Sequence, residues 1–373
     1  MALLNFCTAR KMPQQQLGLA VALSFAVAMS RRWAAGPCPH IMDAPPFSME
    51  GRTAVVTGAN TGIGKQTARN LAIRGGSVIL ACRSVAKGEA AIADIRAAAG
   101  EGGAALKLHA MYLDLASLAS VRDFAKAVTK RVSKTAGSGL DVLVLNAGVM
   151  GVGASKTMRV NHVGHFLLTQ LLIPQMVRVE KKMRKKKNNN NNNKKLVARV
   201  VVVSSDFQKF GNTARFADDL EGYVAAKDGE IATSLQGYQD SKLANVLFAS
   251  ELQRRADHAF GAGALVAVSL HPGGIITDIT RNWFPRWLNP AVRLSSLAFL
   301  KTVEEGAMTT THGALATELE PPAIGGRFLC DCRVVDPNAG GVAGGSSDNR
   351  TAAKLLWESS VRLVDGVDAT VMV

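Results

Sequence analysis

The N-terminal part of the sequence lacks acidic residues, and it lacks an apolar run long enough to cross a bilayer. Residues 1–42 contain no Asp or Glu, and the uncharged stretch Leu17–Met29 lies between basic pairs. A spanning helix needs about 20 apolar residues, so this stretch is too short. Its length suits a signal peptide with a cleavage site near Ala26–Ala28, an organelle transit sequence or a short membrane-surface anchor. We therefore place residues 1–48 outside the fold and expect an organelle or endomembrane location, either plastid or endoplasmic reticulum.

Cysteine is scarce and follows no framework spacing. The five cysteines stand at positions 7, 38, 82, 330 and 332. An odd number without regular spacing argues against a secreted domain held by disulfides. Cys330 and Cys332 lack a second ligand pair for zinc, and we interpret them as ordinary strand residues. His162 and His165 have no third ligand nearby, so we predict packing roles for them and no metal site.

Negative charge is also scarce, but only locally. The formal net charge is +15, and most of it comes from the N-terminal segment and from the tract KKMRKKKNNNNNNKK at residues 181–195. The remaining chain is nearly balanced. The tract has no apolar periodicity, so we predict a disordered surface insertion at about 180–196, with a tether to anionic lipid or polyanion as the alternative. It has no interleaved aromatic residues for stacking on bases, so we expect no nucleic-acid partner.

Strand and helix patterns alternate from Gly51 onward. Short apolar runs separated by helical patterns indicate a parallel sheet covered on both faces. We therefore predict an α/β fold with a doubly wound parallel (Rossmann) sheet, forming a single domain over residues 49–373. The predicted strands are Thr53–Thr57, Ser77–Cys82, Leu106–Leu113, Val142–Leu145, Val200–Ser204, Leu265–Leu270 and Arg327–Val335. Helical patterns end near Ile73 and Ala99, span 117–132 and 157–180, run from the Tyr238 region to Asp257, and recur near Ala352–Leu363.

A glycine-rich loop, TGANTGIG, stands between the first strand and the first helix at Thr57–Gly64. Glycines at this place let the backbone approach a pyrophosphate that sits on the helix N-terminus. The predicted nucleotide-binding residues of this loop are Gly58, Asn60, Thr61, Gly62, Ile63 and Gly64. The second strand ends in Cys82 and Arg83, where an acid would favour NAD. A guanidinium suits a 2′-phosphate, so we predict NADP(H) as the cofactor.

Tyr238 and Lys242 are four residues apart in the stretch QGYQDSKLAN. On a helix their side chains leave the same face about one turn apart. A fixed ammonium at that distance favours phenolate and lowers the pKa of the phenol from its usual value near 10. The pair therefore suits proton transfer to or from an oxygen near neutral pH.

Taken together, these motifs resemble the short-chain dehydrogenase/reductase family over roughly residues 50–365. The resemblance rests on motifs that occur in a fixed order: TGANTGIG, Asp114-Leu115, LNAG at 145–148, NHVGH at 161–165, VSS at 203–205, YQDSK at 238–242 and HPG at 271–273. The C-terminal stretches GRFLCDCRVVDP and LLWESS look like the retinol-dehydrogenase-type branch. Leu145 stands where many family members have asparagine, a departure that we expect to be tolerated.

The resemblance implies four catalytic residues. Tyr238 would be the general acid for carbonyl reduction and the base for alcohol oxidation. Lys242 would lower the pKa of Tyr238 and hold the nicotinamide ribose. Ser205 would hydrogen-bond the substrate oxygen, and Asn161 would order a water-linked proton relay behind Lys242. Preplaced donors of this kind suit a carbonyl oxygen on which negative charge develops.

The resemblance also implies a cofactor cleft. Its further residues would be Asp114 and Leu115 near the adenine, Asn146, Ala147 and Gly148 along the cleft, and Pro272, Gly273 and Thr277 beside the nicotinamide and phosphate. Structural alternatives stay open for Asn146, which would tie strands together, and for His271, which would pack. The stretch Asp206–Leu235 would form part of the substrate wall.

The function expected on this basis is NADP(H)-dependent interconversion of a small lipophilic aldehyde or ketone and its alcohol. The aromatic segment Trp283–Leu288 and the apolar stretch Ala291–Leu300 would close over such a substrate, lean on a membrane surface or pack as an ordinary helix. Homo-oligomerisation is a further expectation. Two alternatives are light-dependent reduction of a protochlorophyllide-type pigment and a non-enzymatic, NADP(H)-sensing scaffold of an organelle-membrane complex.

Overall fold

The computed structural model describes Cys38 and residues 48–134, 139–186, 197–275, 301–316, 325–336 and 350–364, side chains of 178–186 excepted. Its strands are β1 Thr53–Thr57, β2 Ser77–Cys82, β3 Leu108–Tyr112, β4 Val142–Leu145, β5 Ala198–Val203, β6 Leu265–His271, β7 Phe328–Cys330 and β8 Arg333–Val335. Its α-helices are α2 Gly62–Ala72, α3 Val85–Ala98, α4 Leu118–Lys134, α5 Ala154–Met158, α6 Gly164–Lys186, α7 Leu220–Ala225, α8 Ser234–Phe260, α10 Val303–Leu315 and α11 Arg350–Leu363.

The strands form one sheet in the order β3-β2-β1-β4-β5-β6-β7-β8. All neighbouring strands from β3 to β7 are parallel. The strand order reverses direction between β1 and β4, where crevices for nucleotides lie in open α/β sheets. The predicted doubly wound α/β fold is therefore confirmed.

The last predicted strand is wrong in one respect, because Arg327–Val335 is not a single extended run. β7 and β8 form an antiparallel hairpin. Asp331 and Cys332 make its turn with φ values of 50° and 59°. This left-handed conformation usually falls to Gly or Asn, so the sequence carries no ordinary turn signal here. The sheet is thus parallel with one antiparallel edge strand.

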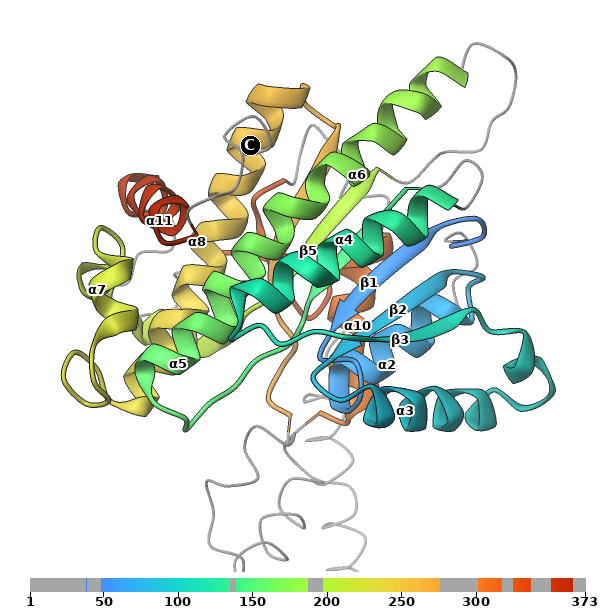
Figure 1. Cartoon of the computed structure of the whole chain (residues 1–373), viewed down its shortest axis with the longest axis horizontal. Coiled ribbons are helices and arrows are strands. Elements are labelled where there is room, and N and C mark those ends of the chain that lie inside the picture. The colour runs from blue at the N-terminus through green and yellow to red at the C-terminus, as the bar shows by residue number, and fades with distance from the viewer. Residues whose placement is uncertain are drawn as a thin grey trace, which may run out of the picture.

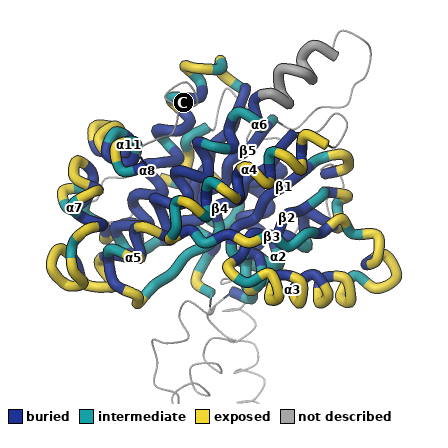
Figure 2. Tube along the Cα trace, in the orientation of Figure 1, coloured by how far each residue is buried: buried dark blue, intermediate teal, exposed yellow. Residues whose placement is uncertain are grey.

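Helices cover both faces of the sheet, as Figure 1 shows. The central strands are apolar along their whole length because neither face meets water, and β1, β4 and β5 are buried at every position. Alternate residues of each strand point to opposite cores. Val55 and Leu143 pack with α4, α6 and α8, whereas Val56 and Val144 pack with α2, α3 and α10. Figure 2 shows the buried sheet between helices whose outer faces are exposed.

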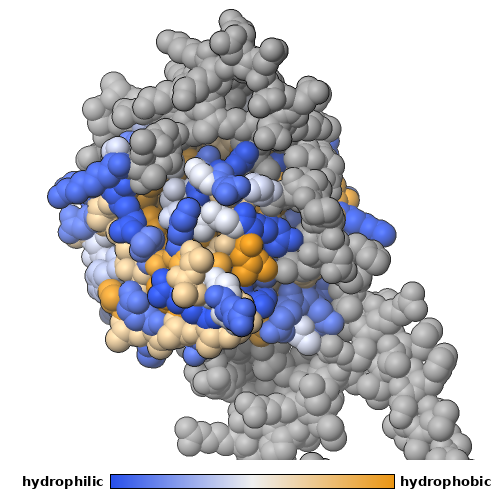
Figure 3. All heavy atoms as spheres, turned by 90° about the vertical axis from the view of Figure 1, so that its right-hand side faces the viewer, coloured by the Kyte–Doolittle hydropathy of each residue, from blue (hydrophilic) through white to orange (hydrophobic). Residues whose placement is uncertain are grey.

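Two surface features bear on the sequence predictions. Helix α6 continues to Lys186, so the first seven residues of the predicted disordered insertion lie in a helix, and residues 187–196 lie outside the described part of the chain. Lys and Arg are good helix formers, which explains the continuation. Figure 3 shows mostly hydrophilic side chains around a small apolar patch on the face at the right of Figure 1. Among the described residues, no helix is both long and apolar enough to span a membrane.

Candidate active site

The carboxyl ends of the parallel strands bring most of the predicted site residues to one edge of the sheet. Each of these residues follows a strand within two positions, and the set comprises Arg83 after β2, Asp114 after β3, Asn146 after β4, Ser205 after β5 and Pro272 after β6. Thr57, which was not predicted, ends β1 at the same edge. Tyr238 and Lys242 reach the same edge from α8. Thr277 lies outside the described residues.

The glycine loop between β1 and α2 has the shape of a phosphate cradle. Gly58 has a φ of 66°, and a side chain there would bring Cβ to 2.9 Å from the Ala147 backbone. A Cβ on Gly64 would lie 2.5 Å from the Gly58 carbonyl oxygen. The positive end of the α2 dipole points into this loop. Only glycine fits at both positions, so the residues present suit a dinucleotide pyrophosphate.

The two predicted residues at the adenine end differ in their surroundings. Arg83 is exposed at the end of β2. The Asp114 carboxylate accepts a hydrogen bond from the Ala116 amide at 3.0 Å, and the Asp114 amide donates to the Ser120 hydroxyl. Asp114 therefore stabilises the turn that leads into α4, whereas Arg83 is solvent-exposed. Leu115 is buried and packs against Gly164.

The hydroxyl of Thr57 fixes the wall of the cleft formed by Asn146, Ala147 and Gly148. It accepts hydrogen bonds from the amides of Asn146 and Ala147, both at 2.9 Å. The Asn146 side chain returns a bond to the Thr57 carbonyl at 2.9 Å. Asn146 thus ties β1 to β4, as its structural alternative expects, and the same bonds orient the wall toward the glycine loop.

A capping box sets the start of helix α8 and so the position of Tyr238. The Thr233 hydroxyl accepts from the Gln236 amide, and the Gln236 side chain accepts from the Thr233 amide. Gly237 lets α5 approach closely, because a Cβ there would overlap Ala154. Tyr238 therefore enters the site from the second turn of a firmly capped helix.

The Ser205 side chain lies close enough to the Tyr238 hydroxyl to lower the pKa of the phenol. The Lys242 ammonium lies 5.5 Å from the centroid of the Tyr238 ring and donates to the Val203 carbonyl at 3.0 Å. The Ser204 hydroxyl donates to the Lys242 carbonyl at 2.7 Å, which joins α8 to the end of β5. Residues from two motifs, distant in sequence, thus form one cluster of a hydroxyl, a phenol and an ammonium.

The expected lowering of the Tyr238 pKa is wrong for this structure. Burial raises the pKa of Tyr238 to about 12, and the hydrogen bond from Ser205 offsets only part of that rise. Burial also lowers the pKa of Lys242 to about 8. Both shifts have the same cause, because a low-dielectric site disfavours each charged form. The Tyr238 phenol is therefore neutral at physiological pH.

Asn161 lies in a π-helical turn, Arg159–Val163, between α5 and α6. Its amide group donates to the Val149 carbonyl and to the Ser241 hydroxyl, both at 3.0 Å, and accepts from the Val149 amide at 2.8 Å. Ser241 in turn donates to the Tyr238 carbonyl at 2.8 Å. Turns of this kind are frequent at functional sites. The side chain of Asn161 thus joins the cleft wall to the helix that carries Tyr238.

The stretch between Ser205 and Tyr238 is held against α8 by a buried carboxylate. Asp240 is fully buried and accepts two hydrogen bonds from the Arg215 guanidinium, at 2.6 and 2.8 Å. It also accepts from the Tyr223 hydroxyl at 3.0 Å and from the Asn212 amide at 2.9 Å. Burial then costs little because the lone pairs are satisfied. The Phe207 ring meets Tyr238 edge-on, with centroids 6.0 Å apart, so this stretch borders the site.

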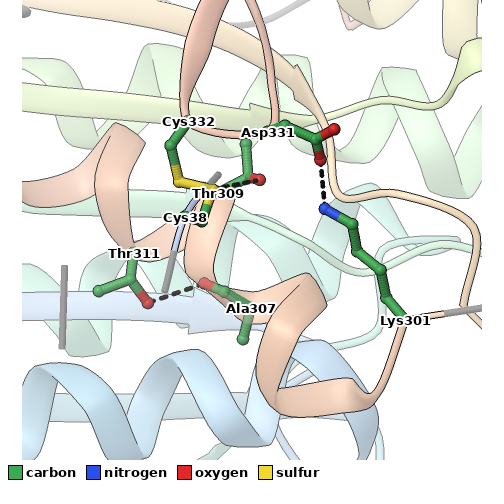
Figure 4. The surroundings of a disulfide bond; sticks show 7 residues. All are labelled: Cys38, Lys301, Ala307, Thr309, Thr311, Asp331 and Cys332. Carbon is green, nitrogen blue, oxygen red and sulfur yellow. Dashed lines mark hydrogen bonds and ion pairs between the residues drawn. A yellow bond between two sulfur atoms is a disulfide. The ribbon is translucent and has the colours of Figure 1, made fainter. Parts of the chain in front are cut away.

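The β6–β8 edge is assembled differently. Its members are Pro272 and Gly273 after β6, Lys301 before α10, Asp331 in the hairpin turn and the Cys38–Cys332 disulfide. The aliphatic part of Lys301 covers Gly273, which has a φ of 98°. The Lys301 ammonium pairs with the Asp331 carboxylate, as Figure 4 shows. Nothing in the sequence motifs pointed to Lys301.

The interpretation of Cys332 as an ordinary strand residue is wrong. Cys332 lies in the hairpin turn and forms a disulfide with Cys38, 294 residues away. The Cys38 sulfur also lies 3.8 Å from the Thr309 hydroxyl of α10 (Figure 4). Cys38 is buried, so at least this position of the segment predicted to lie outside the fold is fixed to it. Cys82 and Cys330 are free thiols.

The two histidines of the NHVGH motif are both buried but face different groups. His162 Nε2 lies 2.9 Å from the Ser360 hydroxyl of α11, whereas His165 Nε2 lies 2.9 Å from the Thr57 hydroxyl. The two imidazoles therefore do not converge on a common ligand. His271 accepts a hydrogen bond from the Asp206 amide at 3.2 Å, and burial lowers its pKa.

A separate hollow of about 460 Å³ lies near the amino ends of β2 and β3. It is lined by Ser77, His109, Ala127, Lys130, Arg131 and Lys134. Burial and the nearby Arg131 lower the pKa of His109. This hollow is remote from Tyr238, and we assign it no part in catalysis.

Thr57, Ser241 and Lys301 are site residues that the sequence analysis did not single out. Thr57 stands first in the glycine-loop motif, and Ser241 lies between Tyr238 and Lys242, so their positions in those motifs were the available signals. Lys301 has no such signal, because the contacts that place it come from Gly273 and Asp331.

Known proteins are similar to this chain in sequence and in fold. Residues 52–227 match a family described as short chain dehydrogenase. Dehydrogenase/reductase SDR family member 13 of Bos taurus is 37% identical over 335 residues, covering 87% of this chain and 77% of that protein. Retinol dehydrogenase 12 of Mus musculus is 35% identical over 339 residues, covering 89% and 90%. A crystal structure of an uncharacterised protein from Mycobacterium paratuberculosis aligns with a TM-score of 0.57 and 30% identity, covering 86% and 96%.

Proposed function

The chain belongs to the short-chain dehydrogenase/reductase family and is a retinol-dehydrogenase-like oxidoreductase acting on CH–OH or carbonyl groups; we propose that it uses NADP(H) to interconvert a lipophilic aldehyde or ketone and its alcohol. The observation that carries this proposal is the cluster of Ser205, Tyr238 and Lys242 at the carboxyl edge of β5. It offers two hydroxyl donors to one substrate oxygen, with a cation behind them.

Each residue of the cluster has a part in carbonyl reduction. The hydroxyls of Ser205 and Tyr238 bind the substrate oxygen and stabilise the negative charge that develops on it. Tyr238 gives this oxygen its proton, since burial keeps the phenol protonated at neutral pH. The Lys242 ammonium stabilises the phenolate that remains, and Asn161 holds the helix of Tyr238 through Ser241. Alcohol oxidation runs the same steps in reverse.

The dinucleotide would lie along the carboxyl edge of the sheet. The loop from Gly58 to Gly64 would hold its pyrophosphate, with Asn60, Thr61, Gly62 and Ile63 around it, and Asn146, Ala147 and Gly148 would line the cleft. Pro272, Gly273 and Thr277 would border the nicotinamide. When bound in reduced form, the cofactor supplies a hydride to the carbonyl carbon. Asp114 and Leu115 would lie beside the adenine.

Arg83 carries the choice of NADP(H) over NAD(H). The guanidinium is exposed at the end of β2, where it can pair with a 2′-phosphate. In Arg83→Ala we expect NADPH affinity to fall roughly tenfold, the loss of one charge-assisted hydrogen bond. NADH affinity should stay within about twofold, because that nucleotide lacks the phosphate. Fluorescence titrations with both nucleotides check this, and equal losses for both would remove Arg83 from phosphate recognition.

The substrate side favours an apolar molecule. Phe207 packs edge-on against both Tyr238 and Phe210, and Phe210 is half exposed. Aromatic rings beside the proton donor suit a lipophilic carbonyl better than a charged one. A membrane surface within an organelle or endomembrane system would supply such a substrate, and we include that location in the proposal. We also propose homo-oligomerisation, by analogy with other members of the family.

A panel of carbonyls and alcohols tests the proposal. Purified protein is incubated with NADPH or NADH and aldehydes of increasing chain length, and nucleotide absorbance is followed. We expect turnover with NADPH that rises with substrate hydrophobicity. The panel includes a protochlorophyllide-type pigment in darkness and in light. Turnover of the pigment only in light, or nucleotide binding without turnover of any carbonyl, would replace this proposal by one of its two alternatives.

A further inference from the structure

His165 lies between the glycine loop and the catalytic asparagine. The side chain is almost fully buried in α6, two residues after the end of the π-helical turn. Its Nδ1 lies 3.0 Å from the Asn161 carbonyl oxygen, and its Nε2 lies 2.9 Å from the Thr57 hydroxyl. These two partners belong to the two halves of the site, the nucleotide loop and the proton-transfer cluster.

The partners fix the tautomer of the imidazole. A carbonyl oxygen only accepts, so Nδ1 carries the proton and donates to Asn161. Burial and the nearby Lys242 lower the pKa of His165 to about 4, so the ring is neutral and Nε2 holds a lone pair. Nε2 therefore accepts the proton of the Thr57 hydroxyl. The ring donates on one side and accepts on the other.

This assignment completes the hydrogen bonding of Thr57. A hydroxyl donates once and accepts twice. The Thr57 hydroxyl accepts from the amides of Asn146 and Ala147 at 2.9 Å. Its one donated bond goes to His165 at 2.9 Å, since the alternative acceptor, the Val144 carbonyl, is 3.4 Å away. The imidazole thereby turns both lone pairs of the hydroxyl toward the cleft wall.

We propose that His165 is a positioning residue which couples the nucleotide-binding wall to the catalytic asparagine. Through Thr57 it sets the orientation of the Asn146–Gly148 wall. Through the Asn161 carbonyl it holds the π-helical turn in place. The Asn161 side chain donates to Ser241, which in turn donates to the Tyr238 carbonyl. Binding of the nucleotide against the wall therefore affects the position of Asn161 and, through Ser241, that of Tyr238. This inference rests on the nucleotide binding proposed above.

His162 is the matched control. It is equally buried, lies three residues earlier in the chain, and burial lowers its pKa to about 3. Its ring, however, contacts Ser360 and the Phe166 and Phe248 rings, away from the nucleotide loop. Replacing either histidine by phenylalanine removes a buried imidazole and adds the same increase in side-chain volume at both positions. The free energy of unfolding, measured in urea, should fall by similar amounts in both variants. Only His165→Phe should change the orientation of the Asn146–Gly148 wall.

The test compares His165→Phe, His165→Gln and His162→Phe with wild type. We expect His165→Phe to weaken NADPH binding about tenfold, as one or two lost hydrogen bonds would, and to lower kcat as well. His162→Phe should bind within about twofold of wild type. Glutamine offers a donor group and an acceptor group, as the neutral imidazole does, so His165→Gln should recover part of the affinity. Equal NADPH affinity in both phenylalanine variants would overturn the inference.

Imidazole nitrogen resonances give a second measurement that a merely structural role would not move. At neutral pH, His165 should show a protonated Nδ1 and an unprotonated Nε2. Adding NADPH should shift its Nε2 resonance and leave that of His162 in place. A protonated Nε2, or no shift on saturation, would contradict the coupling. Absence of carbonyl turnover by wild type would instead refute the proposed function, while the affinities and resonances still decide the role of His165.

Discussion

The two sides of the cleft are built in different ways. On the side of β5 and α8, Ser205, Tyr238, Lys242 and Asn161 each belong to a short motif, and a capped helix carries two of them. On the β6–β8 edge, Lys301, Asp331 and the Cys38–Cys332 disulfide depend on contacts between distant parts of the chain. The residues on the side of β5 and α8 can thus be recognised from local sequence motifs, whereas the β6–β8 edge depends on long-range contacts. Four changes test that difference.

Tyr238→Phe should have the largest effect. The substitution changes only the side of β5 and α8, which we call the motif side because its residues belong to short motifs. Loss of the proton donor should lower kcat by about 10²–10⁴, the usual range for general acid catalysis, while NADPH affinity is retained. Stopped-flow rates and nucleotide titration measure both. The control is Tyr223→Phe, a buried tyrosine bonded to Asp240, which should lose stability but keep kcat within about twofold. Equal rates in Tyr238→Phe and wild type would remove Tyr238 from proton transfer.

Asp240→Asn tests how firmly the motif side is supported. The variant leaves the Arg215 guanidinium, which is 22% exposed, without its carboxylate. Because one partner is fully buried and the other partly hydrated, we expect a loss of about 2–3 kcal/mol in the free energy of unfolding. Urea denaturation measures it. Asp94→Asn, in the exposed pair with Lys65, should cost less than about 1 kcal/mol, and a similar loss in both would contradict the support role.

Cys332→Ser tests the other side. Removing the disulfide should lower the free energy of unfolding by about 2 kcal/mol, at the low end for native disulfides because it ties down a terminal segment. A reductant should lower the unfolding temperature of wild type and leave that of the variant unchanged. Cys330→Ser, a free thiol two residues away, serves as the control. Wild type that is insensitive to reductant would show that the disulfide does not hold this edge.

The pH dependence of reduction should show the smallest effect. The Lys242 ammonium is present below its pKa of about 8 and lost above it, whereas Tyr238, with a pKa of about 12, stays protonated throughout this range. Reductive kcat/KM should therefore fall about fourfold between pH 7 and pH 8.5, as the protonated fraction of a single group falls. Initial rates across this range check it. A profile that stays flat to pH 10 would mean that the ammonium is not required.

Much of the motif side could be predicted because its signals are short in sequence. The four-residue spacing of Tyr238 and Lys242 gave their shared helix face, and the glycine loop gave the phosphate cradle. The meeting of Ser205 with Tyr238 needed the family resemblance, since no spacing relates them. The direction of the Tyr238 pKa could not be predicted, because burial outweighs the nearby charge and burial is a property of the folded chain.

The remaining features depend on tertiary contacts that leave no local pattern. Cys38 pairs with Cys332 across 294 residues, and odd, scattered cysteines gave no indication of it. The β7–β8 turn uses Asp331 and Cys332 at positive φ, where a glycine or asparagine would have marked the turn. The sequence predicts only a packing role for His165. Its contact with Thr57 could not be predicted, because it joins residues 108 positions apart.

Transfer of deuterium from NADPH that carries deuterium at both C4 positions tests the central claim most directly, namely that the Ser205–Tyr238–Lys242 cluster serves carbonyl reduction. Wild type is incubated with the labelled nucleotide and an accepted aldehyde, and the product alcohol is examined by mass spectrometry. We predict one deuterium per product molecule, on the carbon that bears the new hydroxyl. Deuterium on a former carbon–carbon double bond, or none in the product, would contradict this account.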